Sequence, residues 1–259
     1  MVSKEIRAVV VDGDKTLWKG RVAEGIGKSL LISELQKLHL RTFLRGFSGA
    51  KRVKSIIAEN PGIKGETLGQ MEFYNILTEN HLGKKEDMVK IATNYINKNT
   101  IPEVSSLIFQ FSQEGIPIFL STAGGTTSLE AAIKIFKLTD GVSNTELFDK
   151  NNKLIGIELT ITNGENKLYK TVELLNKYNI KLSDCLVIGD SALDIPILKA
   201  SRDAVFSPLA TEDVKQIHSS TDGKITSAKV YSIMRGVVRD TNGCYTPPFT
   251  PLVGKTVKK

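Results

Sequence analysis

The chain has 259 residues, of which 41% are hydrophobic and 24% charged, and its formal net charge is +7. This length suits one large domain or a core with a smaller insert, and the hydrophobic content is sufficient for a buried core. No apolar stretch reaches the length of a membrane span, and the N-terminus does not resemble a signal peptide, so we expect a cytoplasmic protein with no membrane partner.

The basic surplus is compatible with binding to nucleic acid or to anionic substrates. The chain has no zinc-finger spacing and no aromatic-rich RNA-binding strand, so nucleic acid is not the expected main partner. Two cysteines, Cys185 and Cys244, are too few for a disulfide framework and suit a reduced compartment. The sequence does not indicate an oligomeric state.

The first predicted element is a buried strand over residues 6–11, a short β-branched run that ends at polar residues. The pentapeptide Asp12-Gly13-Asp14-Lys15-Thr16 follows it. Residues two apart in extended chain point the same way, so Asp12 and Asp14 are aimed at one spot beyond the strand. Like charges this close repel, which makes chemical sense if a cation lies between them, or if one acid attacks while the other carries a proton.

Two simpler interpretations of this acidic pair have to be considered. It can be a turn or a helix N-cap, or the start of a calcium-binding loop. The calcium loop fails in detail, because Leu17 stands where a glycine is needed and Ala23 where a glutamate is needed.

The remaining chain alternates helices and strands after one helical segment. Residues 19–100 are predicted to be all helical, with helical spacing over residues 29–38, 66–79 and 85–97. Helices are then predicted at 103–113, 128–136 and 167–179, strands at 116–120, 186–188 and 204–206, and a hairpin turn at Asn151 and Asn152. The last twenty residues are expected to form an irregular tail.

This alternation predicts an α/β fold with a doubly wound parallel sheet, in which ligands bind beyond the carboxyl ends of the strands. Three predicted strands end in polar residues at that edge: Asp12 and Asp14, then Ser121 and Thr122, then Asp190. Three carboxylates at one point favour a hard cation with oxygen ligands, which indicates Mg²⁺.

The last of these strands leads into Gly189-Asp190-Ser191-Ala192-Leu193-Asp194. Asp190 and Asp194 are four residues apart, so one helical turn places them on one face. The hydroxyls of Ser121 and Thr122, with the backbone N–H groups of residues 123–125, suit a phosphate. A lysine is needed to balance the charge, and both Lys167 and Lys170 are candidates.

These motifs, in this order, resemble those of the haloacid dehalogenase superfamily over about residues 5–207, and within it those of phosphoserine-phosphatase-like members. The resemblance implies a Rossmann-like core over residues 1–18 and 101–240, an inserted helical cap over residues 19–100 and a tail over residues 241–259. The first motif is Asp12-Gly13-Asp14-Lys15-Thr16, in which Lys15 replaces the commoner glycine. The third motif is a lysine that precedes the motif at Gly189–Asp194, and an ungapped count back from Asp190 favours Lys167 over Lys170 for it.

The resemblance also implies roles for individual residues. Asp12 attacks phosphorus, Asp14 carries the proton, and Ser121, Thr122 and Lys167 hold the phosphate. Mg²⁺ is held by Asp12, Asp190 and the backbone carbonyl of Asp14, while Asp194 supports the site.

The expected function is therefore Mg²⁺-dependent hydrolysis of a small phosphate ester through an aspartyl phosphate. A phosphomutase or a non-catalytic basic binding protein on the same scaffold is the alternative, and a dehalogenase fits less well. Arg21 stands where phosphoserine phosphatases carry an acid, which argues against phosphoserine itself as the substrate. Arg21, Arg45 and Lys51 are candidate substrate contacts from the cap.

Overall fold

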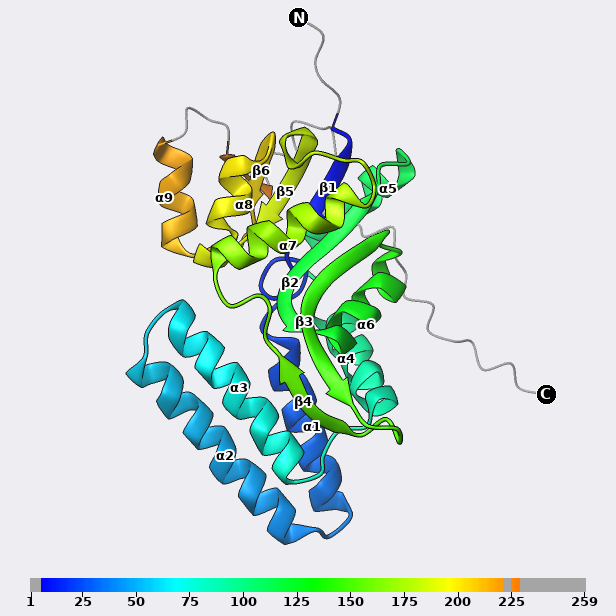
Figure 1. Ribbon diagram of the computed structural model, residues 1–259, viewed down its shortest axis with the longest axis vertical. Helices are drawn as coiled ribbons and strands as arrows, with labels where there is room; N and C mark the ends of the chain where they lie inside the picture. The colour runs from blue at the N-terminus through cyan, green and yellow to red at the C-terminus, as the bar shows by residue number, and fades with distance from the viewer. Residues whose placement is uncertain (1–5, 221–224, 229–259) are drawn as a thin grey trace, which may run out of the picture.

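The computed structural model describes residues 6–220 and 225–228, and its centre is one seven-stranded sheet (Figure 1). The strands are β1 (Ala8–Val11), β2 (Ile118–Gly125), β3 (Asp140–Phe148), β4 (Leu154–Glu158), β5 (Cys185–Gly189), β6 (Asp203–Phe206) and β7 (Ile225–Ser227). Their order is β4-β3-β2-β1-β5-β6-β7, and only β4 runs antiparallel to its neighbour. The predicted α/β class is confirmed.

Helices cover both faces of the sheet. Val9 and Val11 of β1 lie in one buried cluster with α5 (Pro102–Gln113) and α6 (Thr126–Phe136). Ala8 and Val10 lie in a second cluster with α7 (Gly164–Asn176) and α8 (Ile195–Ala200). A central parallel strand is buried on both faces, which is why β1 contains only apolar residues. The helix α9 (Glu212–Ser220) follows β6, and single 3₁₀ turns span Leu182–Asp184 and Ala192–Asp194.

Four helices fill the insertion between β1 and α5: α1 (Val22–Gln36), α2 (Leu40–Glu59), α3 (Ile63–Glu79) and α4 (Lys85–Asn99). The chain enters and leaves this insertion side by side, since the Lys19 N–H donates to the Asn99 carbonyl at 2.7 Å and the Ile101 N–H to the Leu17 carbonyl at 2.9 Å. Helix α4 packs against α6, whereas α2 and α3 form a hairpin that extends away from the sheet (Figure 1). The predicted all-helical character of this segment is confirmed.

The sequence pattern did not delimit α2, and the reason lies in its packing. Gly46 and Gly49 interrupt the hydrophobic spacing, yet they are the buried residues of this helix. A Cβ atom at Gly46 would lie 2.1 Å from a methyl carbon of Leu31, and one at Gly49 2.7 Å from a methyl carbon of Ile76. The close approach of α1 and α3 to α2 therefore requires glycine at positions where the sequence pattern predicts a larger apolar residue.

Other differences from the predictions are smaller. Strand β2 continues past residue 120 to Gly125, and α9 and β7 were not predicted. The hairpin turn is present, with Asn152 at φ 59°. None of the described helices has the length and apolar character that crossing a bilayer requires. The predicted tail, 241–259, lies outside the described residues.

Candidate active site

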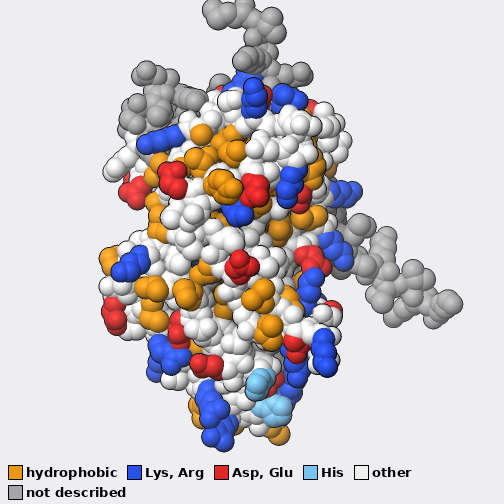
Figure 2. All heavy atoms as spheres, viewed as in Figure 1, with side chains coloured by type: hydrophobic (Ala, Val, Ile, Leu, Met, Phe, Trp, Pro, Cys, Tyr) orange, Lys and Arg blue, Asp and Glu red, His pale blue; other side chains and the backbone are white. Residues whose placement is uncertain are grey.

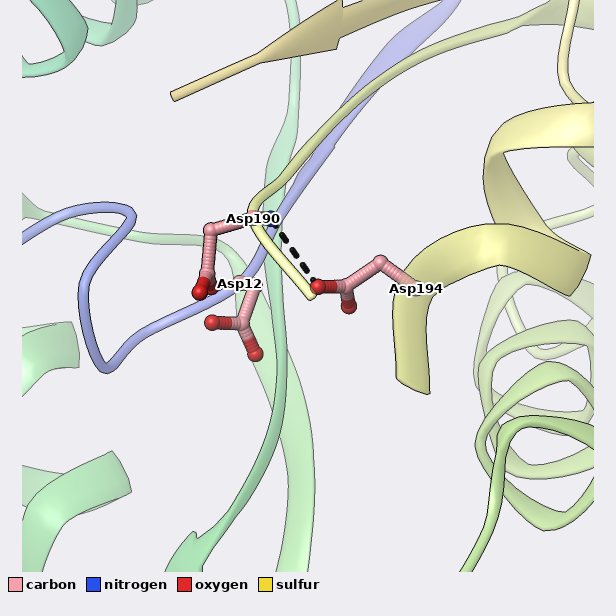
Figure 3. A group of neighbouring side chains, drawn as sticks. All are labelled: Asp12, Asp190 and Asp194. Carbon is pink, nitrogen blue, oxygen red and sulfur yellow. Dashed lines mark hydrogen bonds between the residues drawn. The ribbon is translucent and has the colours of Figure 1, made fainter. Parts of the chain in front are cut away.

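Three buried carboxylates meet at the carboxyl edge of the sheet. Asp12 follows β1 and Asp190 follows β5, the parallel neighbour whose Ile188 is in register with Val11. One oxygen from each of Asp12, Asp190 and Asp194 lies within 4.8 Å of the other two. The Asp12 and Asp190 carboxylates lie side by side, and Asp194 reaches toward them from the following turn (Figure 3).

Lys167 joins two of these carboxylates. Its ammonium nitrogen, Nζ, donates to Oδ1 of Asp12 at 2.5 Å and to Oδ1 of Asp194 at 2.6 Å, and its side chain is only 1% exposed. Burial by itself lowers the pKa of Lys167, but Asp12 and Asp194 outweigh it and hold the pKa above its ordinary value. Lys170, the alternative lysine, is instead at the surface with Glu173 at 3.0 Å.

Asp194 is fixed by the turn that carries it. Its second oxygen, Oδ2, accepts a hydrogen bond from the backbone N–H of Asp190 at 3.0 Å (Figure 3). The backbone N–H of Ser191 donates to the same oxygen at 3.0 Å. Both oxygens of Asp194 are therefore occupied. A Cβ atom at Gly189 would lie 2.6 Å from the Cβ atom of Asp194, so the glycine makes room for this arrangement.

Asp190 leaves one buried oxygen without a hydrogen bond. Its Oδ1 accepts from the Thr16 hydroxyl at 2.8 Å, whereas no described residue donates to Oδ2. Burial, followed by repulsion from Asp12 and Asp194, raises the pKa of Asp190 to about 9. Burial likewise raises the pKa of Asp12 to about 7, although Lys167 opposes the shift. An unpartnered carboxylate oxygen beside a second carboxylate fits a divalent cation, and an oxygen-only ligand set suits Mg²⁺.

Asp14 has different surroundings from Asp12. Its Oδ1 accepts from the indole N–H of Trp18 at 2.6 Å and from the backbone N–H of Val22, at the start of α1, at 3.2 Å. Burial raises the pKa of Asp14 above its ordinary value, and both hydrogen bonds work against that rise. Asp12 and Asp14 both follow β1, yet they have different hydrogen-bond partners, which suits different chemical roles.

Two hydroxyl residues of β2, Ser121 and Thr122, also differ in their surroundings. Pairing of β2 with β3 shifts register between Ser121 and Gly125, which frees the backbone there from the regular ladder. Thr122 lines the pocket, and its hydroxyl accepts from the Gly124 N–H at 3.0 Å. Ser121 is fully buried and shares a 2.8 Å hydrogen bond with Thr171 of α7; of these two described residues, only Thr122 lines the pocket.

A buried amide connects the two sides of this anion-binding region. Oδ1 of Asn144 accepts from the N–H groups of Thr160 and Ile161, both at 2.8 Å, in the loop that leads to α7. Its Nδ2 donates to the Ala123 carbonyl at 2.8 Å, and Gln70 of α3 donates to the same carbonyl at 2.8 Å. Asn144 therefore fixes the last part of β2 relative to the loop before α7.

The pocket encloses about 190 Å³ between the sheet edge and helices α1 to α3. Apolar side chains from α2 and α3, Val53, Ile57 and Phe73, line one wall. Arg21 lines the pocket and pairs with Glu66 of α3, which also lines it. Arg45 and Lys51, the other two candidate substrate contacts from the sequence, are not among the described residues that line the pocket.

Sequence reasoning missed four residues that support the site: Thr16, Trp18, Asn144 and Thr171. Two of them carried a signal. Thr16 and Trp18 lie four residues after Asp12 and Asp14, and Trp18 is the single tryptophan of the chain. Asn144 and Thr171 act through folding contacts from distant elements, and no local pattern marks them.

Comparison with known proteins gives a consistent result. A family model described as haloacid dehalogenase-like hydrolase matches residues 6–202. No curated protein matches the chain.

Several solved structures have a similar fold. A phosphoserine phosphatase with a phospho-aspartyl intermediate analogue is 16% identical, with a TM-score of 0.62 over 91% of this chain and 100% of that one. A hydrolase of the same family from Salmonella enterica subsp. enterica serovar Typhi is also 16% identical, with a TM-score of 0.62 over 86% of this chain and 68% of that one. A protein of unknown function from Bordetella pertussis Tohama I is 13% identical, with a TM-score of 0.66 over 86% and 99%. At these identities the likeness shows the fold alone.

Proposed function

The chain belongs to the haloacid dehalogenase-like hydrolases, and from this membership we propose that it is a Mg²⁺-dependent phosphatase acting on a small phosphorylated metabolite in the cytoplasm. One observation carries the proposal: Asp190 clusters with Asp12 and Asp194, which pair with the buried ammonium of Lys167, and one Asp190 oxygen has no hydrogen-bond partner among the described residues. The phosphoserine phosphatases among proteins of similar fold support the reaction class.

Asp12 is the nucleophile in this scheme. A carboxylate oxygen of Asp12 attacks phosphorus and forms an aspartyl phosphate, while the bond from phosphorus to the ester oxygen breaks. Asp14, whose pKa is raised by burial, donates its proton to the leaving oxygen. Asp14 then accepts a proton from the water that hydrolyses the aspartyl phosphate, which restores both acids.

Lys167 has the capacity to bind the phosphate. An ammonium group has three donors, and two of them go to Asp12 and Asp194. The third is available to a phosphate oxygen, since Lys167 also lines the pocket. Thr122 and the backbone around Gly124 supply the facing wall, with Ser121 beneath them holding α7 through Thr171.

Mg²⁺ would be held by Asp12, Asp190 and the backbone carbonyl of Asp14. When bound, it would offset the repulsion between the Asp12 carboxylate and the incoming phosphate. Asp194 is a partner of Lys167 in this scheme, because both of its oxygens already accept hydrogen bonds.

The pocket favours a compact substrate. A volume of about 190 Å³ is below the range of roughly 300–1,000 Å³ typical for drug-sized ligands. The insertion, 19–100, acts as the cap in this proposal, because α2 and α3 contribute the apolar wall of Val53, Ile57 and Phe73. Arg21 and Glu66 offer one charge of each sign to the leaving group.

The test is phosphate release from a panel of phosphorylated metabolites and a chromogenic phosphate ester, with and without Mg²⁺. We expect release that depends on Mg²⁺ and is lost in Asp12→Asn, while Lys170→Met, a matched surface variant, retains it. Release of free phosphate separates hydrolysis from a phosphomutase, which would transfer the group to a sugar hydroxyl. Hydrolysis by Asp12→Asn at the wild-type rate would refute the scheme.

A further inference from the structure

Helices α1 and α2 expose an unusual number of large apolar side chains where they meet. Leu38 in the connecting turn is 87% exposed, and Leu44 and Phe47 of α2 are 55% and 52% exposed. We define the α1–α2 patch as the exposed side chains Ile32, Leu35, Leu38, Leu40, Leu44 and Phe47. Scattered apolar residues are normal on a surface, whereas these six exposed side chains lie within sixteen positions of the chain, around the turn that joins two helices.

A segment that overlaps the patch and begins just after Glu34 carries most of the net charge of the chain. Residues 35–58 contain six lysines and arginines and no aspartate or glutamate, against a formal net charge of +7 for all 259 residues. Lys37 and Arg52 pair with acids outside this segment. Within the part of the chain that the structure describes, the other four cations form no ion pair; they are Arg41, Arg45, Lys51 and Lys54.

The apolar and basic residues of α2 form two adjacent faces. At about 100° per residue, Leu40, Leu44 and Phe47 fall within about 60° of one another, and Arg41 and Arg45 follow on the neighbouring face. Lys51 continues the apolar stripe, with its ammonium 5.2 Å from the centre of the Phe47 ring.

The patch lies at the end of the insertion farthest from the sheet, where α1 turns into α2 (Figure 1). Figure 2 shows basic, histidine and hydrophobic side chains together at this end of the molecule. The other end of α2 supplies Val53 and Ile57 to the pocket. The patch is therefore separate from the carboxylate cluster, and its cations are not accounted for by the proposed reaction.

We propose that the α1–α2 patch binds the surface of an anionic lipid bilayer. An amphipathic helix of this kind lies in the interface, with apolar side chains among the acyl chains and lysine and arginine at the lipid phosphates. Such binding needs no spanning helix, and it goes beyond the sequence-based expectation, which gave the protein no membrane partner.

Two other occupants fit the same residues less well. A two-fold dimer through this patch would bring the same acid-free basic segment of both copies together, and like charges would oppose it. Nucleic acid would use the cations but would leave Leu44 and Phe47 with no apolar partner.

The test uses the full chain and sedimentation with vesicles of phosphatidylcholine alone, or of phosphatidylcholine with about 30% phosphatidylglycerol. We expect binding to the anionic vesicles only, and weaker binding as salt rises from about 0.05 M to about 0.5 M. Loss of each basic residue at an anionic surface weakens partitioning roughly fivefold, and the added glutamates are repelled, so Arg41→Glu/Arg45→Glu should bind at least about 25-fold more weakly. Leu44→Ser/Phe47→Ser should bind at least about tenfold more weakly.

Matched controls change the same chemistry elsewhere. Lys177→Glu/Lys199→Glu makes the same change of charge at exposed positions outside the helical insertion. Ile155→Ser/Leu209→Ser removes two exposed apolar groups, also outside the insertion. Both controls should bind like wild type, and circular dichroism should show all variants folded. Vesicle binding is measured without phosphate release, so a failure of this proposal can be distinguished from a failure of the proposed reaction.

The proposal is overturned by equal binding of wild type to neutral vesicles, by no binding to either vesicle, or by undiminished binding of either patch variant. It is also overturned if light scattering finds a dimer that Leu44→Ser/Phe47→Ser converts to monomer while anionic vesicles bind neither form.

Discussion

The indole N–H of Trp18 donates a 2.6 Å hydrogen bond to Oδ1 of Asp14, four residues earlier. Burial raises the pKa of Asp14, and this hydrogen bond opposes the rise because it stabilises the ionised carboxylate. Trp18→Phe keeps an aromatic ring and removes the donor, so the pKa of Asp14 should rise further. Because the proposed first step needs protonated Asp14, the alkaline limb of the pH profile for kcat should move to higher pH. An unmoved limb in pH–rate profiles would exclude Trp18 from tuning this acid.

The two candidate lysines make opposite predictions. Lys167→Met leaves Asp12 and Asp194 buried without their cation, and we expect kcat/KM to fall by about 10² or more. The same variant should lose about 3–5 kcal/mol in the free energy of unfolding, as expected when one partner of a buried ion pair is removed. Lys170→Met should change both quantities little, because its partner is a surface acid, Glu173. Steady-state kinetics and urea unfolding of both variants measure this contrast.

Ser121 and Thr122 should also separate in their effects. Thr122→Val removes the hydroxyl of a residue that lines the pocket and the acceptor of the Gly124 N–H, so we expect a higher KM and a loss of about 1 kcal/mol in stability. Ser121→Ala leaves the Thr171 hydroxyl with one buried partner fewer, so we expect a similar loss of stability and a smaller change in KM. In steady-state kinetics, a larger rise in KM for Ser121→Ala than for Thr122→Val would mean that Ser121, rather than Thr122, contacts the phosphate.

The stability of the protein without divalent metal should fall as the pH rises. Burial raises the pKa of Asp12 to about 7 and that of Asp190 to about 9, both above their value in the unfolded chain. Between roughly pH 4 and 9 the folded state therefore binds more protons than the unfolded state, and each pH unit costs stability. We expect the Tm in chelator to be lower at pH 8.5 than at pH 6, with the difference reduced by Mg²⁺, as scanning calorimetry can measure. A Tm in chelator that is equal or higher at pH 8.5 would contradict the raised pKa values.

Lys15 adopts a left-handed backbone conformation, with φ at 61°. This is the position where the first motif of the related family more commonly has glycine, and the conformation costs a residue with a side chain roughly 1–2 kcal/mol. Replacing Lys15 with glycine would relieve this cost, but the greater conformational freedom of glycine in the unfolded chain would offset part of the gain in stability. Lys15→Gly should therefore stabilise the protein by up to about 1 kcal/mol in urea unfolding. Lys15→Ala is the matched control, since it removes the ammonium but keeps the Cβ atom, and it should show no such gain.

The sequence could predict those parts of the site that follow apolar strands. Buried runs before Asp12 and Asp190 identify two strand ends, and parallel strands bring such ends to one edge. It could not predict which of Ser121 and Thr122 lines the pocket, because the register shift between Ser121 and Gly125 depends on the pairing of β2 with β3.

Helix α2 shows the same limit in the fold. Its glycines weaken the local helical pattern, and only contact with α1 and α3 explains why they are there. The uneven charge of residues 35–58 is visible in the sequence, but whether Arg45 and Lys51 face the substrate is decided by how α2 packs.

The carboxamide of Asn144 has a consequence for how the protein can change over time. Only a group with a donor and an acceptor can serve both the Ala123 carbonyl and the N–H groups of Thr160 and Ile161. An aspartate there would face the carbonyl without a proton to offer. A leucine would leave the N–H groups of Thr160 and Ile161 without their acceptor, and only Gln70 would still donate to the Ala123 carbonyl. Drift at this one position would disturb both loops at once, so neighbouring segments of the two loops are expected to covary among descendants of this chain.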